Sequence, residues 1–119
     1  MNTDIPVDLV PHANLWIERG GRVALSRWRV QLLEAIEATG SISAAAEKIG
    51  VQYRLAWERL EEMEEGLGVR LVERHVGGAG GGGAVVTPIG QNLIARFNAF
   101  ATAVEAAVDD EFQRHFHSS

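Results

Sequence analysis

The stretch Ser43–Trp57, SAAAEKIGVQYRLAW, carries the pattern that decides the fold. Alanines fill the segment before Gly50, and the apolar residue Val51 follows that glycine directly. Small residues let a second helix cross the first closely, and glycine takes a turn conformation that costs other residues free energy. In a helix–turn–helix, Ala46 therefore suits the close contact between the two helices, and Gly50 suits the turn. Val51 would fill the space between the helices. A generic helical hairpin can show the same spacing.

The helix after this turn is expected from about Gln52 to Glu65. Its apolar seam consists of Ala56, Leu60 and Met63. At about 100° per residue, the seam leaves Arg54 pointing away from the core, with Tyr53 at the N-terminal end. That end of a recognition helix reaches base edges, and arginine bonds guanine or phosphate. The alternative for Arg54 is a solvated surface arginine, and the acidic run Glu61–Glu65 is expected to be a solvated face. The candidate DNA contacts here are Ser43, Gln52, Tyr53 and Arg54.

The flanking segments predict a small domain that is mainly α-helical with β-hairpins. Strand-like runs on either side of Gly20-Gly21 indicate a hairpin. Ser26 is expected to cap a first helix that ends at Gly40, Ser43 to cap the second, and Thr87 to cap a last helix that starts at Pro88. The expected organisation is an N-terminal arm (1–13), a winged helix–turn–helix domain (14–87), and a C-terminal dimerisation helix with a tail (88–119).

Six of the seven residues Gly77–Gly83 are glycine, between strand-like runs at Val69–Arg74 and Ala84–Thr87. No Gly-Lys-Ser/Thr follows, so a nucleotide-binding loop is not indicated. The segment instead predicts the tip of a β-hairpin, whose N–H groups can donate to DNA phosphates. A flexible surface loop is the alternative. The candidate wing contacts are Arg74, His75, Gly78, Gly80 and Gly81.

The last helix carries an apolar stripe at three- and four-residue spacing and is expected to exceed 25 residues. A helix of that length is too long for so small a domain, so part of the stripe should meet a second copy. The predicted dimerisation residues are Leu93, Phe97, Phe100, Val104 and Val108. His115 and His117 are expected to lie in a frayed tail rather than to bind a metal, because positions i and i+2 of a helix do not share a face.

Composition describes an ordinary globular protein: 119 residues, 46% hydrophobic, 23% charged, and no cysteine. The formal net charge of −5 counts against nucleic-acid binding. Four arginines between Arg19 and Arg29, with no acid among them, provide a local basic surface, and Arg27 is the candidate DNA contact there. Neither a signal peptide nor a membrane segment is apparent, and we expect a cytoplasmic protein with no catalytic or metal-binding constellation.

Several segments together resemble the LysR-type winged helix–turn–helix. They are Gly40–Ala46, Gly50-Val51, Leu67–Arg74, Thr87 and Gly90. Within that group, Tyr53–Trp57 and the glycine-rich string 77–85 resemble ModE-type molybdate-responsive regulators. The resemblance implies a homodimer through long C-terminal helices, with DNA contacts at Gln52, Tyr53, Arg54 and the wing. Full-length ModE-type proteins continue into molybdate-binding domains, which are absent from these 119 residues, so we expect no cofactor in this chain.

The leading hypothesis is a transcription regulator that binds a palindromic operator in double-stranded DNA as a homodimer, in molybdenum-related gene control. The alternative is a winged-helix interaction module that dimerises with or titrates another regulator without binding DNA. The net acidity favours the alternative, whereas Arg54 and the Arg19–Arg29 cluster favour DNA. An enzyme is the least supported hypothesis.

Overall fold

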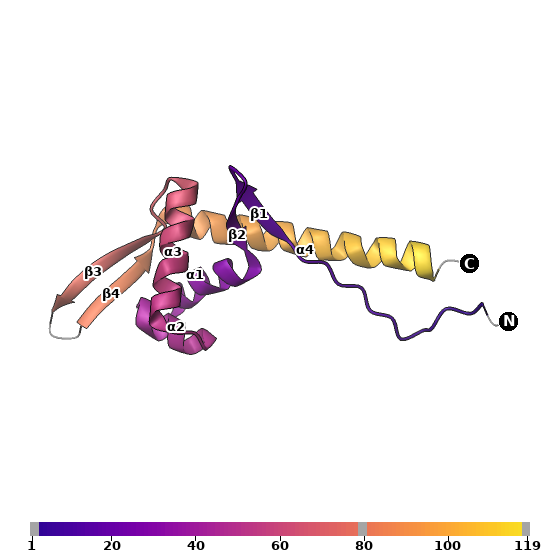
Figure 1. Cartoon of the computed structure of the whole chain (residues 1–119), viewed down its shortest axis with the longest axis horizontal. Helices are drawn as coiled ribbons and strands as arrows, with labels where there is room; N and C mark the ends of the chain where they lie inside the picture. Colours follow the sequence, from indigo (N-terminus) through magenta and orange to yellow (C-terminus); the bar gives the residue numbers. More distant parts are fainter. Residues whose placement is uncertain (1–2, 79–80, 118–119) are drawn as a thin grey trace.

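The computed structural model describes residues 3–78 and 81–117, with no side-chain detail at 76–78 and 81. Three helices form a cluster, a β-hairpin projects from one end of it, and a long helix extends from the other (Figure 1). The elements are β1 (Trp16–Arg19), β2 (Arg22–Ser26), α1 (Arg27–Thr39), α2 (Ile42–Ile49), α3 (Tyr53–Leu67), β3 (Val72–Gly78), β4 (Gly81–Val86) and α4 (Pro88–Phe116). The predicted fold class, mainly α with small β-hairpins, is confirmed.

Most of the predicted helix ends are confirmed by their hydrogen bonds. The Ser26 hydroxyl accepts the Arg29 N–H at 3.2 Å, and the Thr87 hydroxyl accepts the Gly90 N–H at 3.1 Å. The prediction for Ser43 was wrong, because Ser41 caps α2 and accepts the Ala44 N–H at 2.9 Å. Both serines are suitable caps in sequence; burial of Ile42 in the core favours the earlier start.

The core lies between α1, α2, α3, the base of the β3–β4 hairpin and the first half of α4. Its largest fully buried side chains are Val30, Leu32, Leu33, Ile36, Leu60, Met63, Leu71, Val72 and Phe97. Gly90 allows α4 to pack closely on the base of the β3–β4 hairpin. A Cβ at that position would lie 2.7 Å from the Leu71 carbonyl oxygen and from the Val86 side chain.

The β3–β4 hairpin, which we call the wing, runs further into the glycine-rich string than predicted. Residues 69–71 are not strand, while β3 continues to Gly78 and β4 begins at Gly81. A glycine-rich sequence carries little strand propensity, but the antiparallel partner supplies the backbone hydrogen bonds that extend both strands. The N–H of Ala84 also donates to the Gly40 carbonyl at 2.8 Å, which joins the wing to the end of α1.

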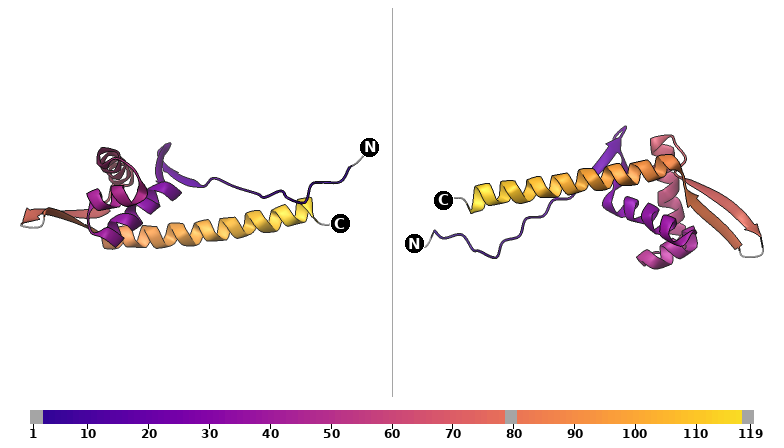
Figure 2. Two further views of the ribbon diagram at one scale, coloured as in Figure 1. Left: turned by 90° about the horizontal axis from the view of Figure 1, so that it is seen from below. Right: turned by 180° about the vertical axis from the view of Figure 1, so that it is seen from behind.

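Helix α4 spans 29 residues, which agrees with the predicted length of more than 25 residues. Only Gly90, Ile94, Phe97 and Ala101 are buried along it, so its C-terminal half extends beyond the domain (Figure 2). The molecule therefore measures 71 × 28 × 21 Å. The helix also includes His115, whose Nε2 lies 3.2 Å from Glu111 Oε2, so the frayed tail predicted there is instead the last turn of α4.

The predicted dimerisation stripe divides into two groups. Phe97 is 2% exposed and belongs to the core of its own chain, so its assignment to a dimer surface was wrong. Leu93 is half-buried against that core. Phe100 is 47% exposed, and Val104 and Val108 are half-buried near the N-terminal arm. No helix within the described ranges is long and apolar enough to cross a membrane.

Candidate nucleic-acid interface

The turn between α2 and α3 has the geometry that the sequence indicates. Gly50 takes a φ of 75°, and the Val51 N–H donates a hydrogen bond of 2.9 Å to the Ala46 carbonyl. Ala46 and Ala56 are 1% and 0% exposed, so the backbones of the two helices can approach at these small residues. The two helices therefore form a fixed unit, in which α2 and the turn hold the start of α3 in place.

The N-terminal end of α3 is exposed and lacks a side-chain cap. Gln52 is the N-cap residue, and its side chain makes no capping hydrogen bond, which leaves the first N–H groups of α3 to solvent or a ligand. Tyr53 is 51% exposed. Arg54 has 89% of its side chain exposed and pairs with Glu58 at 3.3 Å. An exposed pair of this kind is weak, at about 0.3–0.5 kcal/mol, so Arg54 can exchange Glu58 for a base or phosphate.

A hollow of about 440 Å³ opens between this end of α3, the start of α2 and the wing. We call it the wing groove. It brings together four of the predicted contacts from three separate elements, and it also includes backbone of the glycine-rich strand. Its lining includes Ser43, Tyr53, Trp57, Arg74, His75 and Gly83.

Arg74 faces this groove but is already bound by its own chain. Its Nη2 donates to Glu64 Oε1 at 3.0 Å, and its guanidinium lies 4.5 Å from the centre of the Trp57 ring. The other Glu64 oxygen accepts the N–H groups of Leu71 and Val72 at 2.8 and 3.2 Å. Glu64 and Arg74 are 15% and 22% exposed. These contacts fasten the base of the wing to α3, so Arg74 holds the wing in place rather than offering a free cation.

Glu64 is the residue that the sequence reasoning missed, because the acidic run at 61–65 was interpreted as a solvated face. Its position beside the seam residues Leu60 and Met63 was the available signal. A carboxylate on the flank of a buried seam is exposed to solvent only if nothing packs over it, and here the start of β3 does.

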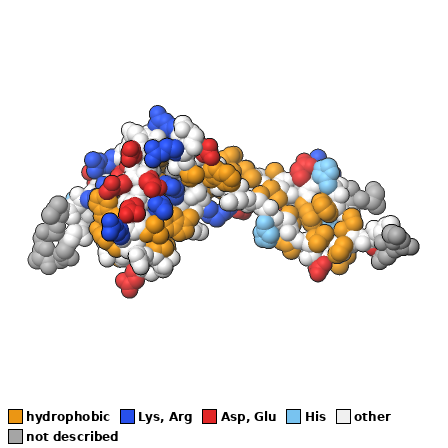
Figure 3. Space-filling view, in the orientation of Figure 1, with side chains coloured by type: hydrophobic (Ala, Val, Ile, Leu, Met, Phe, Trp, Pro, Cys, Tyr) orange, Lys and Arg blue, Asp and Glu red, His pale blue; other side chains and the backbone are white. Residues whose placement is uncertain are grey.

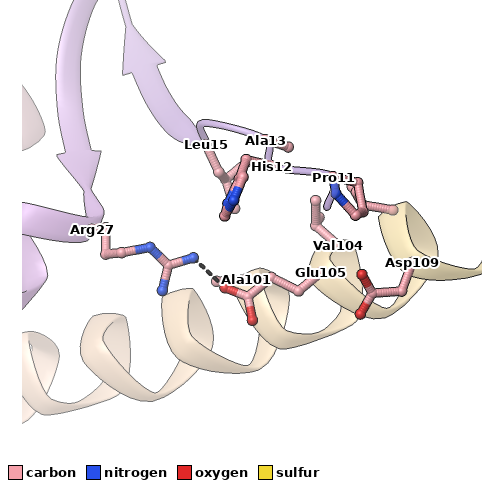
Figure 4. Close-up of a pocket in the computed structure, with 10 residues that line it drawn as sticks. Pro11, His12, Ala13, Leu15, Arg27, Ala101, Val104, Glu105 and Asp109 are labelled. Atoms are coloured by element: carbon pink, nitrogen blue, oxygen red, sulfur yellow. Dashed lines mark hydrogen bonds and ion pairs between the residues drawn. The ribbon is translucent and has the colours of Figure 1, made fainter. Parts of the chain in front are cut away.

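The basic surface predicted between Arg19 and Arg29 is not formed near the groove. Arg19 donates to the Leu67 carbonyl at the C-terminal end of α3, and Arg29 pairs with Glu62 at 3.1 Å. Arg27 pairs with Glu105 of α4 at 2.5 Å, beside the N-terminal arm (Figure 4). These three arginines neutralise acids or cap carbonyls within the chain, and Arg27 does not join the other candidate contacts.

Gly78 and Gly81 face each other across the wing ladder, while Gly80 lies outside the described residues. Acidic and basic side chains are interspersed over the visible face of the helical cluster, without a continuous basic patch (Figure 3). Among the residues that the structure describes, no three potential metal ligands cluster.

Two helices joined by a glycine turn and followed by a β-hairpin wing define the winged helix–turn–helix class of protein. Residues 28–91 match the family described as bacterial regulatory helix-turn-helix protein, lysR family, and the chain belongs to that family.

Two curated relatives match part of this chain. The molybdenum-pterin-binding protein MopB of Rhodobacter capsulatus is 44% identical over 88 residues, which are 74% of this chain and 32% of that protein. The DNA-binding transcriptional dual regulator ModE of Escherichia coli K12 is 43% identical over 81 residues, 68% of this chain and 31% of that protein. The chain thus spans about a third of the length of the curated relatives that it matches.

Solved structures share the fold. The CbnR DNA-binding domain, crystallised in a complex with DNA, superposes with a TM-score of 0.60 at 18% identity, covering 76% of this chain and 99% of that one. The BenM DNA-binding domain in a complex with benA site 1 DNA gives 0.59 at 19% identity, covering 79% and 100%. At these identities the likeness establishes the fold alone.

Proposed function

We propose that this protein is a transcription regulator that reads a palindromic operator in double-stranded DNA as a homodimer. The observation that carries the proposal is the exposed N-terminal end of α3 beside the wing groove. There Tyr53 and Arg54 project from a helix fixed by its neighbours, and Ser43 and the wing backbone lie close by. A recognition helix enters the major groove with this end, and the groove between α2 and the wing suits the adjoining phosphate backbone.

The charge of the protein is compatible with this role. The acids that produce the net charge of −5 are concentrated at Glu58–Glu65 and Glu105–Glu111, away from the N-terminal end of α3, except for Glu58. Uncapped N–H groups at the start of a helix attract phosphate without a basic side chain. In this proposal, the affinity for DNA comes from a few specific groups at the start of α3 rather than from a large positively charged surface.

Helix α4 supports the proposed homodimer. Its C-terminal half leaves the domain with an apolar stripe that its own chain covers only in part, and Phe100 is half-exposed. A two-fold pair of such helices places two copies of α3 at a fixed separation, which a palindromic site matches when its half-sites lie about one helical turn apart.

The proposed regulatory context is molybdenum. MopB, the relative with 44% identity, is named a molybdenum-pterin-binding protein, and ModE, with 43% identity, is named a DNA-binding transcriptional dual regulator. In this proposal the 119 residues supply DNA recognition and hold no cofactor themselves.

The test is selection from a pool of random DNA duplexes, followed by binding of the recovered sequences at two salt concentrations. We expect enrichment of an inverted repeat with half-site centres about 10 base pairs apart. Recovery of a single half-site would contradict the homodimer. Absence of any enriched sequence would contradict sequence-specific binding and would favour an interaction module that acts on another regulator.

A further inference from the structure

The N-terminal arm, residues 3–13, has a base that packs on its own chain. Pro11, His12 and Ala13 line a cleft with Val104 and Asp109 of α4, beside the Arg27–Glu105 ion pair (Figure 4). From this base the rest of the arm extends beside the C-terminal half of α4 toward the end of that helix, so its chain direction is opposite to that of α4 (Figures 1 and 2). The arm is therefore anchored at one end, close to the free half of the helix.

The outer part of the arm is apolar, and its own chain does not cover it. The exposed fractions are 49% for Ile5, 89% for Val7, 40% for Leu9 and 70% for Val10. Four large apolar side chains within six residues are unusual for a segment that remains in water, because single exposed apolar residues are common but contiguous patches mark interaction sites.

Helix α4 presents a second uncovered apolar surface beside the arm. The apolar lining of an open groove along its C-terminal half consists of Pro11 of the arm and of Val104, Ala107, Val108, Phe112 and Phe116, and Glu111 and His115 also border the groove. Hydrophobic side chains also gather over this end of the molecule in the space-filling view (Figure 3). The base of the arm thus forms one edge of this apolar groove, which we call the channel, and the exposed outer arm continues from that edge.

The charges along α4 indicate what fills the channel. Residues 88–104 contain Arg96 and no acid, whereas residues 105–116 contain four carboxylates and one arginine. Among the described residues, Arg96 bonds only Asn92, at 2.6 Å, and Asp109 and Asp110 make no ion pair. An antiparallel second α4 would bring its arginine-bearing half opposite these acids, and opposite charges across a helix pair favour that orientation.

We propose that the arm of each protomer is a strap that covers α4 of a second copy of this chain. The second α4 lies antiparallel in the channel, and the outer arm packs on its first turns, where Ile89 is 42% exposed. This inference rests on the homodimer of the proposed function and adds a contact that the helices alone do not provide. The arm is thereby part of the dimer interface rather than a loose end.

Val7→Asp is the test, with Val85→Asp as the matched control. Both valines are exposed, at 89% and 55%, and both changes give the same net charge, but Val85 lies on the wing. We expect Val7→Asp to raise the dimer dissociation constant in sedimentation equilibrium at least about tenfold, because an unpaired carboxylate would be buried in each of two equivalent contacts. The control should leave the constant unchanged. Cooperative unfolding with equal midpoints at concentrations low enough to dissociate both dimers would show that both monomers fold.

A cysteine cross-link distinguishes contacts between copies from contacts within one. The natural sequence has no cysteine, so a chain with Val7→Cys can be mixed with one that carries Gln91→Cys or Ala95→Cys. We expect a disulfide-linked pair of different chains, and none with Val85→Cys. A wild-type dimer that Val7→Asp does not weaken would overturn the strap while leaving the homodimer intact. A wild-type chain that stays monomeric at all concentrations would overturn both.

Discussion

Replacing Phe97 by alanine is expected to lower the free energy of unfolding by about 3–5 kcal/mol, the usual range for a buried phenylalanine. The side chain is 2% exposed and belongs to the core that joins α4 to the helical cluster. Removing the ring leaves a cavity that close-packed neighbours fill only in part. Urea unfolding at several protein concentrations gives the value and separates it from any contribution of dimerisation.

Phe100→Ala is the matched control on the same helix. Its ring is 47% exposed, so the same truncation should change monomer stability by less than about 0.5 kcal/mol and instead weaken self-association. Similar losses of monomer stability from both variants would mean that α4 does not divide into a buried and a free part as described.

Glu64→Gln is expected to destabilise the protein by about 1–3 kcal/mol and to weaken DNA binding. The substitution keeps the size of the side chain but removes the charge that faces Arg74, and it weakens the acceptor of two backbone N–H groups. A mostly buried guanidinium without its counter-ion costs free energy, because Arg74 cannot lose its proton. The wing should then lose its fixed angle to α3.

Glu61→Gln provides the control for Glu64→Gln, because Glu61 is an exposed carboxylate on the same helix. We expect its stability to stay within about 0.5 kcal/mol of wild type. Denaturant unfolding and binding to the selected operator measure the two effects. If both glutamates prove equally dispensable, the wing does not depend on the Glu64–Arg74 contact.

Local patterns in the sequence were sufficient for most of the fold. Glycine at a positive φ, serine and threonine caps, and the three- and four-residue spacing of apolar side chains each act over a few residues, so the helices and the Gly50 turn could be predicted. The choice of Ser41 over Ser43 could not, because it depends on burial of Ile42 by distant segments.

The sequence was not sufficient to predict which charged side chains form ion pairs with each other. Arg27 and Glu105 are 78 residues apart and Arg29 and Glu62 are 33 apart, so their pairing depends on tertiary structure. Phe97 and Phe100 belong to one apolar stripe, and only the packing of α4 on the domain separates core from surface. The exposed face at the N-terminal end of α3, by contrast, is determined by the apolar seam of the same helix. Arg54 was therefore predicted correctly to point away from the core.

The most direct test of DNA binding at the end of α3 compares Arg54→Ala with Arg22→Ala. Both arginines are exposed, and each substitution makes the chain more acidic by one charge, but Arg22 lies on the β1–β2 hairpin among the arginines first assigned to a basic surface. Measured on the selected operator at one salt concentration, Arg54→Ala should weaken binding about 5- to 150-fold, the equivalent of about 1–3 kcal/mol. Arg22→Ala should stay within about twofold of wild type. Equal losses, or a larger loss from Arg22→Ala, would contradict the placement of the DNA at the start of α3.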